Sequence, residues 1–175
     1  MILSHTQSFP LAPMSRIIGI LTITLLAIPI ALILAPLRYP RALPIAPVGL
    51  CIAVLYAVIW FLMRPSAFVV RPEGVEIVWP LRRRLILKEN ILEAEVVHPE
   101  DLRHEFGLLL RFGAGGLWGG FGLALSTKGE HLGLLVSRHR DGFVLLRCKN
   151  VRSILLTPTL PSDFVAAVRA LSSTR

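Results

Sequence analysis

Two stretches of the 175-residue sequence decide its fold: IIGILTITLLAIPIALILAPL, which is Ile17–Leu37, and ALPIAPVGLCIAVLYAVIWFLM, which is Ala42–Met63. They hold 21 and 22 residues without one charged side chain. A helix rises about 1.5 Å per residue, so about 20 apolar residues cross a hydrocarbon core about 30 Å thick. Because lipid offers the backbone no hydrogen-bond partner, each stretch should be helical. The sequence therefore predicts two transmembrane spans, at about 17–37 and 43–63.

The linker between the spans is short and contains Pro40, which predicts an antiparallel helical hairpin over residues 16–64. A cleaved signal peptide has an apolar core of only about 7–15 residues. Buried helices of a soluble protein are amphipathic, whereas these stretches are apolar on every side. Both alternatives are therefore disfavoured. Pro29, inside the first span, predicts a kink.

Small side chains within the spans mark where helices can pack closely. Such residues let two backbones approach in a bilayer, where close packing drives helix association. We expect them to support lateral contact with a neighbouring membrane protein. They are Gly19, Ala27, Ala31, Gly49 and Ala53.

Arginines give the expected orientation of the hairpin. Beside the spans, two arginines lie at each end: Arg16 and Arg64 against Arg38 and Arg41. The arginine run at 82–84 adds charge on the C-terminal side, and positive charge is retained in the cytoplasm. We therefore expect an inner-membrane protein with both termini and the C-terminal domain in the cytoplasm.

Residues 66–175 form a second unit with the alternating pattern of β-strands. Val75 and Ile77 alternate with Glu76, which is typical of a strand with one buried face. Turn signals such as Asp141-Gly142 separate the apolar runs. About seven strands are expected, near 67–71, 74–79, 82–87, 91–97, 107–112, either 121–127 or 132–137, and 143–148, with 152–157 as a further candidate.

The last element is predicted to be a helix over about 162–172. Ser162 or Asp163 is a typical helix cap, and Phe164 and Val168 follow at helical spacing. A helix after antiparallel strands predicts a sheet or small barrel whose open end the helix covers.

At the other end of the chain, Met1–Ser15 is apolar and contains proline. This N-terminal segment has no obvious fold of its own, so we expect it to become ordered only on a partner.

Two segments of the second unit resemble the bacterial pleckstrin-homology (PH) domain families. These are the glycine-rich run RFGAGGLWGGFG at 111–122 and LTPTLPSDF at 156–164. The resemblance covers about residues 66–172 and implies an antiparallel β-barrel or sandwich capped by a C-terminal helix. It also implies a binding or assembly role without catalytic residues. The chain is thus expected to be an α+β membrane protein, a two-helix transmembrane hairpin followed by a PH-like domain.

The glycine-rich run lacks the motifs of nucleotide binding. No Gly-Lys-Ser/Thr follows it, and Trp118 stands where a dinucleotide fingerprint needs its last glycine. The glycines fit a bulged hairpin that needs positive φ angles. The apolar residues Leu117, Trp118 and Phe121 are expected to be exposed at its tip, where they would contact a protein or the membrane.

Basic residues give the chain a net charge of +8 and favour lipid over nucleic acid as a partner. Arg82, Arg83 and Arg84 either attract anionic lipid or lie on a solvated strand edge. A second basic region spans 138–152, and neither region has the aromatic residues of an RNA-stacking surface. The acidic residues between Glu89 and Glu105 are expected to form a solvated face rather than ion pairs.

No catalytic, metal or cofactor site is predicted. His98 and His104 lack the further ligands that a zinc site needs. Cys148 lies in an apolar strand, where an inert thiol is expected. No Gly-x-Ser-x-Gly nucleophile motif occurs, and neither span holds a charge that could serve transport.

These observations predict a non-catalytic, membrane-anchored accessory or assembly subunit. Its hairpin and PH-like domain would bind and stabilise a larger integral-membrane complex, such as a respiratory or photosynthetic core, a secretion system or a transporter. Neither a small-molecule substrate nor a nucleic acid is expected. The alternative is an anionic-lipid-responsive module at the membrane surface, which would act through the arginine run at 82–84 and through Trp118.

Overall fold

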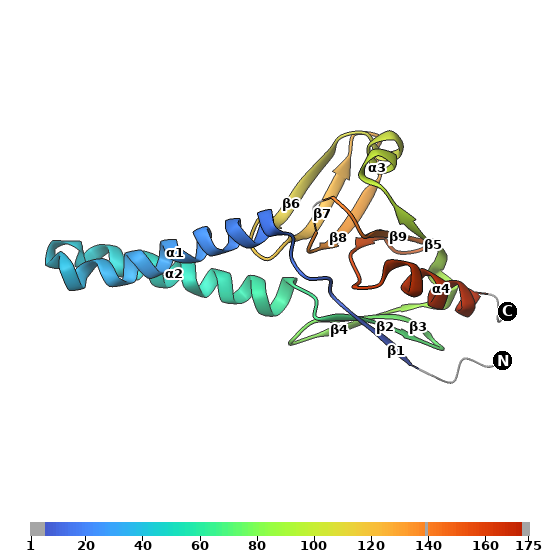
Figure 1. Ribbon diagram of the computed structural model, residues 1–175, viewed down its shortest axis with the longest axis horizontal. Helices are drawn as coiled ribbons and strands as arrows, with labels where there is room; N and C mark the ends of the chain where they lie inside the picture. Colours follow the sequence, from blue (N-terminus) through green and yellow to red (C-terminus); the bar gives the residue numbers. More distant parts are fainter. Residues whose placement is uncertain (1–5, 139, 173–175) are drawn as a thin grey trace.

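The computed structural model describes residues 6–138 and 140–172, and a helical hairpin projects from one end of its β-rich domain (Figure 1). The hairpin consists of α1 (Arg16–Arg38), a 3-10 helix (Pro40–Ile45), α2 (Ala46–Val58) and a π-helical turn (Ile59–Met63). Its two halves, Arg16–Arg38 and Pro40–Met63, have mean hydropathies of 2.8 and 2.4. By length and composition, both are able to span a membrane.

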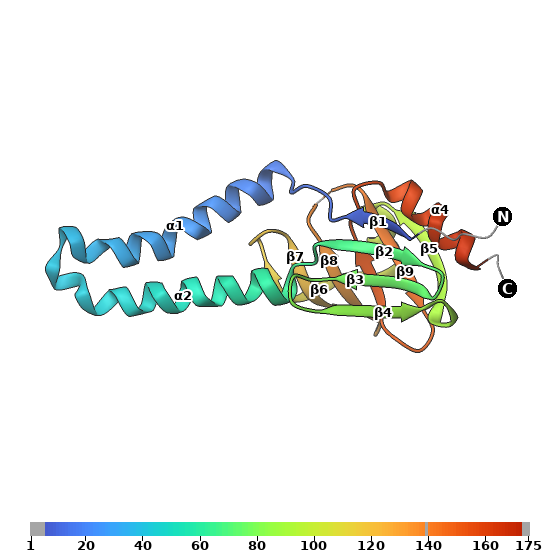
Figure 2. The same ribbon diagram turned by 90° about the horizontal axis from the view of Figure 1, so that it is seen from below.

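Proline shapes the first helix of the hairpin and its turn. Pro29 lies inside α1, where its ring removes a backbone hydrogen bond, and Figure 2 shows that α1 bends along its length. Pro40 and Pro44 lie in the 3-10 helix. The connection between the two α-helices is therefore longer than the short linker that the sequence suggested.

The domain consists of two β-sheets. The first holds, in spatial order, β1 (Gln7–Pro10), β2 (Ala67–Arg71), β3 (Gly74–Val78) and β4 (Arg83–Leu87). The second holds β5 (Ile91–Val97), β9 (Phe143–Cys148), β10 (Ser153–Leu156), β8 (His131–Val136), β7 (Gly120–Ser126) and β6 (Leu109–Gly115). Neighbouring strands are antiparallel except β8 and β10, which are parallel. In the part of the chain that the structure describes, the sheets stay open and do not close into the barrel that was one of the expected forms.

The segment before α1 is folded, which corrects the expectation that Met1–Ser15 has no fold of its own. β1 pairs with the edge of β2, and Leu11 and Ala12 behind it are buried. Phe9 explains this docking, because its ring meets the ring of Phe164 edge-on with centroids 5.3 Å apart. Residues 1–5 lie outside the described residues.

Two further elements differ from the expected pattern. One strand was expected in either 121–127 or 132–137, whereas β7 and β8 form in both places. A short helix, α3 (Pro99–Phe106), lies between β5 and β6, where none was predicted. Its sequence is mostly polar, because its buried side is made by Leu102 and Phe106 alone.

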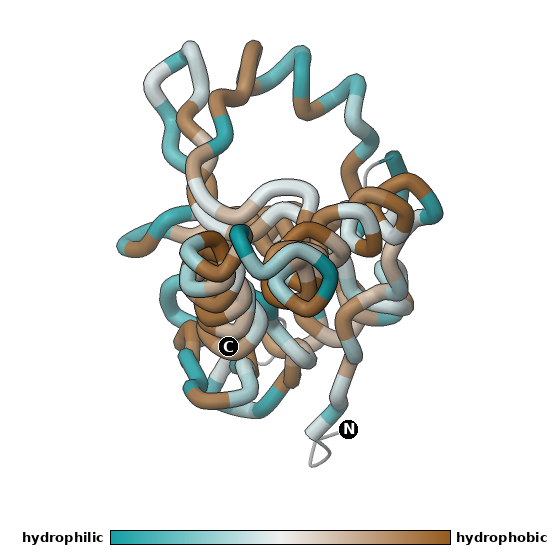
Figure 3. The backbone as a smooth tube through the Cα atoms, turned by 90° about the vertical axis from the view of Figure 1, so that its left-hand side faces the viewer, coloured by the Kyte–Doolittle hydropathy of each residue, from teal (hydrophilic) through white to brown (hydrophobic). Residues whose placement is uncertain are grey.

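Apolar side chains pack on both faces of the second sheet. Between the two sheets lie buried residues such as Phe68 and Ile77, and α4 (Pro161–Ser172) adds Phe164. On the opposite face, α3 covers a smaller cluster. Figure 3 colours the backbone by hydropathy and shows hydrophobic and hydrophilic stretches side by side. In both ribbon views α4 lies away from the hairpin, so the other end of the sandwich meets the helices.

Candidate binding surfaces

The turn between β6 and β7 packs against the hairpin. We call residues 113–122, which hold six glycines, the glycine tip. Leu117, Trp118 and Phe121 were expected to be exposed there, and this prediction is wrong, since they are only 3%, 9% and 1% exposed. The prediction failed because it took no account of tertiary contacts: Trp60 of the hairpin packs on Trp118, and Phe121 belongs to the buried core of the domain.

Thr22 of α1 holds the glycine tip by two hydrogen bonds. Its hydroxyl donates to the Gly116 carbonyl oxygen at 3.2 Å and accepts from the backbone N–H of Trp118 at 2.9 Å. Thr22 is 4% exposed, so these polar groups satisfy one another away from solvent. Gly116 has a φ of +87°, and a Cβ there would lie 2.6 Å from the Leu21 side chain. The positive φ favours glycine at this position, and a Cβ there would also force the Leu21 side chain to move.

All three tryptophans of the chain lie where the hairpin meets the domain. The rings of Trp60 and Trp118 meet edge-on, with centroids 4.7 Å apart. The ring N–H of Trp79 donates to the carbonyl oxygen of Met63, which ends the π-helical turn, at 3.0 Å. We call Trp60, Trp79 and Trp118 the tryptophan junction. Together with Thr22, the junction ties both helices of the hairpin to the domain.

Among the small residues of the hairpin, Gly49 lies where the two helices come closest. A Cβ at Gly49 would lie 2.9 Å from the Cβ of Leu32 and 3.0 Å from the carbonyl oxygen of Pro29. Around Gly19, no described atom lies within 4 Å of such a Cβ. The remaining small residues are Ala27 and Ala31, which are exposed, and Ala53, which is half-buried. Gly49 therefore serves packing within the hairpin, whereas the described residues leave space beside Gly19.

A groove of about 480 Å³ lies between the start of α1, strand β6 and α3. We call it the interfacial groove. Its lining includes Ile17, Leu21, Leu108 and Phe112, which are between 43% and 59% exposed. β6 is also an edge of the second sheet. Contiguous exposed apolar surface of this kind marks a contact with protein or lipid.

A second opening, of about 690 Å³, lies between the two sheets beside β4. We call it the inter-sheet pocket. Arg82, Arg83 and Arg84 line it together with Arg152, which the sequence placed in a separate basic region. The guanidinium of Arg82 lies over the ring of Trp79, 4.5 Å from the ring centre. The arginine run thus lines a cavity next to the tryptophan junction.

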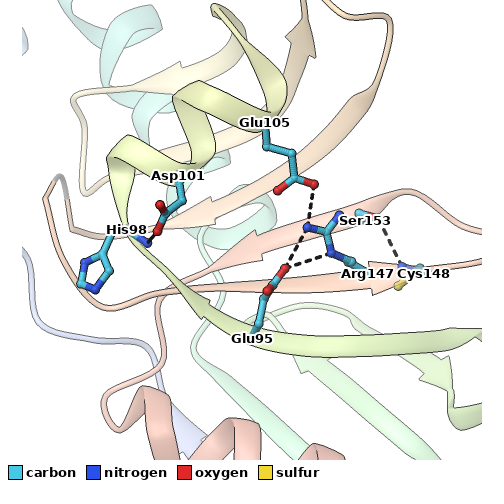
Figure 4. Close-up of polar contacts among 7 residues, drawn as sticks. All are labelled: Glu95, His98, Asp101, Glu105, Arg147, Cys148 and Ser153. Carbon is cyan, nitrogen blue, oxygen red and sulfur yellow. Dashed lines mark hydrogen bonds and ion pairs between the residues drawn. The ribbon is translucent and has the colours of Figure 1, made fainter.

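Polar side chains near α3 bind one another (Figure 4). Arg147 on β9 bridges Glu95 on β5 and Glu105 on α3, with N–O distances of 2.8 and 2.6 Å. At the start of α3, the backbone N–H of His98 donates to a carboxylate oxygen of Asp101 at 3.4 Å. Part of the acidic face that was expected to be solvated therefore attaches α3 to the second sheet.

The remaining candidates for chemistry are possible metal ligands and the Cys148 thiol. Within residues 6–138 and 140–172, no group of three His, Cys, Asp or Glu residues is placed to hold a metal ion. Burial raises the pKa of the Cys148 thiol to about 11, against a smaller opposing effect of the Arg84 charge. The thiol therefore stays protonated near neutral pH, where it is a weak nucleophile.

Comparison of the chain with protein-family models, with curated proteins and with solved structures gives no match. Its function must therefore be argued from the hairpin, the glycine tip and the two openings.

Proposed function

We propose that this chain is a non-catalytic, membrane-anchored accessory subunit that binds and stabilises a larger integral-membrane complex. The hairpin carries this proposal. In the most apolar 18-residue stretch of each helical segment, only 11% and 6% of the stretch is buried. Ile20, Ile23 and Leu37 are 66%, 71% and 84% exposed. Contact of apolar surface with water costs about 25 cal/mol per Å². Insertion of both helical segments into a bilayer removes that cost.

The finer assignments within this proposal rest on sequence patterns. The PH-like character of the domain is supported by its two packed sheets, by the helix that follows them and by the glycine-rich run 111–122. A bacterial origin follows from the same resemblance. The arginine run at 82–84 supports an inner-membrane protein with its domain and termini in the cytoplasm.

One observation carries the assembly role: the interfacial groove continues the apolar side of α1 onto the domain. Ile17 and Leu21 line the groove from α1. Phe112 lines it from β6, and Leu108 lines it from the residue just before that strand. Thr22 and the tryptophan junction hold these two parts in a fixed relation. A partner helix that runs along α1 and emerges from the bilayer would meet one continuous apolar surface. We infer that the groove receives an apolar membrane segment of another subunit.

Charge at the groove narrows the kind of partner. Arg103 and Arg111 line the groove and are exposed. Complementary charge across an interface fixes register and suppresses wrong partners. The partner segment should therefore carry acidic residues where it leaves the apolar layer.

Purification of the full chain from native membranes in a mild detergent, followed by native mass spectrometry, tests the proposal. We expect a second integral-membrane protein at fixed stoichiometry. Phe112→Ser should lower the amount of co-purified partner about tenfold, because large aromatic side chains dominate interface energies. Leu92→Ser is the matched control, since Leu92 on β5 is 61% exposed against 56% for Phe112 and lies outside the groove. A monodisperse monomer, or equal loss of partner in both variants, would contradict the proposal.

A further inference from the structure

The inter-sheet pocket lies where the first sheet ends and the second continues. β4 is the edge of the four-stranded sheet, and residues of β7, β8 and β10 from the six-stranded sheet form the pocket floor. Leu123, Leu135 and Ile154 make this floor apolar. Gly133, which pairs with Leu123, also lines it and brings no side chain into the space. One wall of the pocket is therefore suited to hydrocarbon.

The lining of the pocket also includes four arginines and no acidic residue: Arg82, Arg83, Arg84 and Arg152. The arginines that form ion pairs elsewhere are Arg71, Arg138 and Arg147. Within residues 6–138 and 140–172, none of the four pocket arginines has a carboxylate partner. Four arginines at the lining of one opening, with no acidic residue among its lining residues, create a positive potential that favours an anionic ligand.

The strand register places one of these arginines toward the pocket, and a ring contact places another. Arg84 pairs across the strands with Ile77, which is fully buried, so both side chains lie on the inner face of the first sheet. Arg82 is stacked over Trp79. A guanidinium presents paired N–H donors that match the oxygens of a phosphate. The pocket can thus offer several donors to one phosphate group.

The pocket begins where the hairpin ends. Met63, the last residue of the helical segment Pro40–Met63, lines it, and its carbonyl oxygen accepts from Trp79. In the proposed membrane placement this is the depth of the lipid headgroups, a layer in which tryptophan is enriched. An anion that is abundant at this depth is the phosphate of a phospholipid.

We propose that the inter-sheet pocket binds the phosphate group of an anionic phospholipid, with Arg82, Arg84 and Arg152 as the donors. The glycerol and the first acyl carbons lie against the floor of Leu123 and Leu135. This inference rests on the membrane placement of the proposed function but not on its protein partner. Free phosphate offers the arginines the same chemistry and gains nothing from the apolar floor.

Native mass spectrometry of the full chain in a neutral detergent tests the inference. The chain is titrated with dioctanoyl phosphatidylglycerol, with dioctanoyl phosphatidylcholine and with inorganic phosphate. We expect phosphatidylglycerol to bind about tenfold more tightly than the other two, with an affinity that falls as salt rises. Equal affinity for the two lipids, or binding of phosphate as tight as that of phosphatidylglycerol, would overturn it.

Matched variants locate the binding. R84Q/R152Q should weaken phosphatidylglycerol binding about tenfold. R140Q/R169Q removes the same charge from exposed positions outside the pocket and should bind like the unchanged chain. Equal weakening by both double variants would assign binding to net charge and overturn the site.

Two further results separate this inference from other causes. Arg84→Lys keeps the positive charge and should retain part of the binding; loss as complete as in R84Q/R152Q, in a chain that still folds by circular dichroism, would contradict a charge-driven site. A purified chain that binds phosphatidylglycerol but brings no protein partner from membranes would support the pocket and contradict the accessory role alone.

Discussion

The hairpin and the domain contain the same apolar residue types and place them in opposite ways. In the domain, Phe68, Phe121 and Phe164 are 0%, 1% and 0% exposed. In the hairpin, the most apolar 18-residue stretches of the two helical segments are buried over only 11% and 6% of their length. The domain makes its own apolar surroundings by folding, whereas the hairpin needs them to be supplied from outside. High hydropathy alone therefore does not show whether a segment is buried by its own chain or by a partner or lipid.

The contrast ends at the tryptophan junction, where each region provides what the other lacks. Thr22 is a polar residue of an apolar helix, and it is buried by the domain. Leu117 and Trp118 are apolar residues of a glycine turn, and the hairpin buries them. Here the hairpin acts as part of a core.

The largest expected effect lies in the domain core. Phe164→Ala removes a ring whose centroid lies 5.3 Å from that of Phe9 and 6.2 Å from that of Phe68. The cavity should lower the free energy of unfolding by about 3–5 kcal/mol, measured by urea denaturation in detergent. Ile23→Ala, at a residue of α1 that is 71% exposed, should change it by less than about 0.5 kcal/mol. Equal losses would show that helix and domain share one core.

A smaller effect is expected at the junction. Thr22→Val leaves the buried Trp118 N–H and Gly116 carbonyl without their partner, which should cost about 1–3 kcal/mol. Hydrogen exchange at the Trp118 amide should accelerate accordingly. Thr24→Val is the control, because the Thr24 hydroxyl donates to the Ile20 carbonyl oxygen of its own helix. Unchanged exchange in Thr22→Val would mean that packing alone holds the glycine tip.

The smallest effect concerns the Cys148 thiol. Burial raises the pKa of this thiol from its ordinary value of 9.0 to about 11. In a Cys51→Ser background, iodoacetamide at pH 8 should modify the folded chain at least about tenfold more slowly than the unfolded chain. Because the folded pKa lies above the unfolded one, the stability contribution is present below pH 9 and is lost as pH rises toward 11. The unfolding midpoint should therefore fall across this window. The Cys148→Ser variant should lack that part of the decline, and an identical decline in both chains would refute the assignment.

Local patterns were sufficient for the elements that need no distant partner. The uncharged runs within Arg16–Arg38 and Pro40–Met63 predicted two helices, because length and hydropathy are properties of the segments themselves. Most strands of the domain likewise followed from alternation. β1 did not, because Gln7–Pro10 is a short edge strand that forms only on β2. α3 was missed because two buried residues give too weak a periodic signal.

The candidate sites depended on contacts between distant residues, which one sequence does not reveal. The backbone N–H of Trp118 donates to Thr22, which lies 96 positions away. A threonine within an apolar span was a visible signal, but Thr24 offered the same signal and its hydroxyl donates to Ile20 of its own helix. The arginine run at 82–84 was recognised, whereas its meeting with Arg152 depends on how the two sheets face each other.

The tryptophan junction gathers every indole of the chain into one layer. The ultraviolet emission of the protein is therefore a local signal, to which neither the far end of the hairpin nor α4 contributes an indole. Lipids brominated at successive acyl carbons would quench this emission according to their distance from the layer. Without any added label, the chain can thus report how deeply it sits in a bilayer.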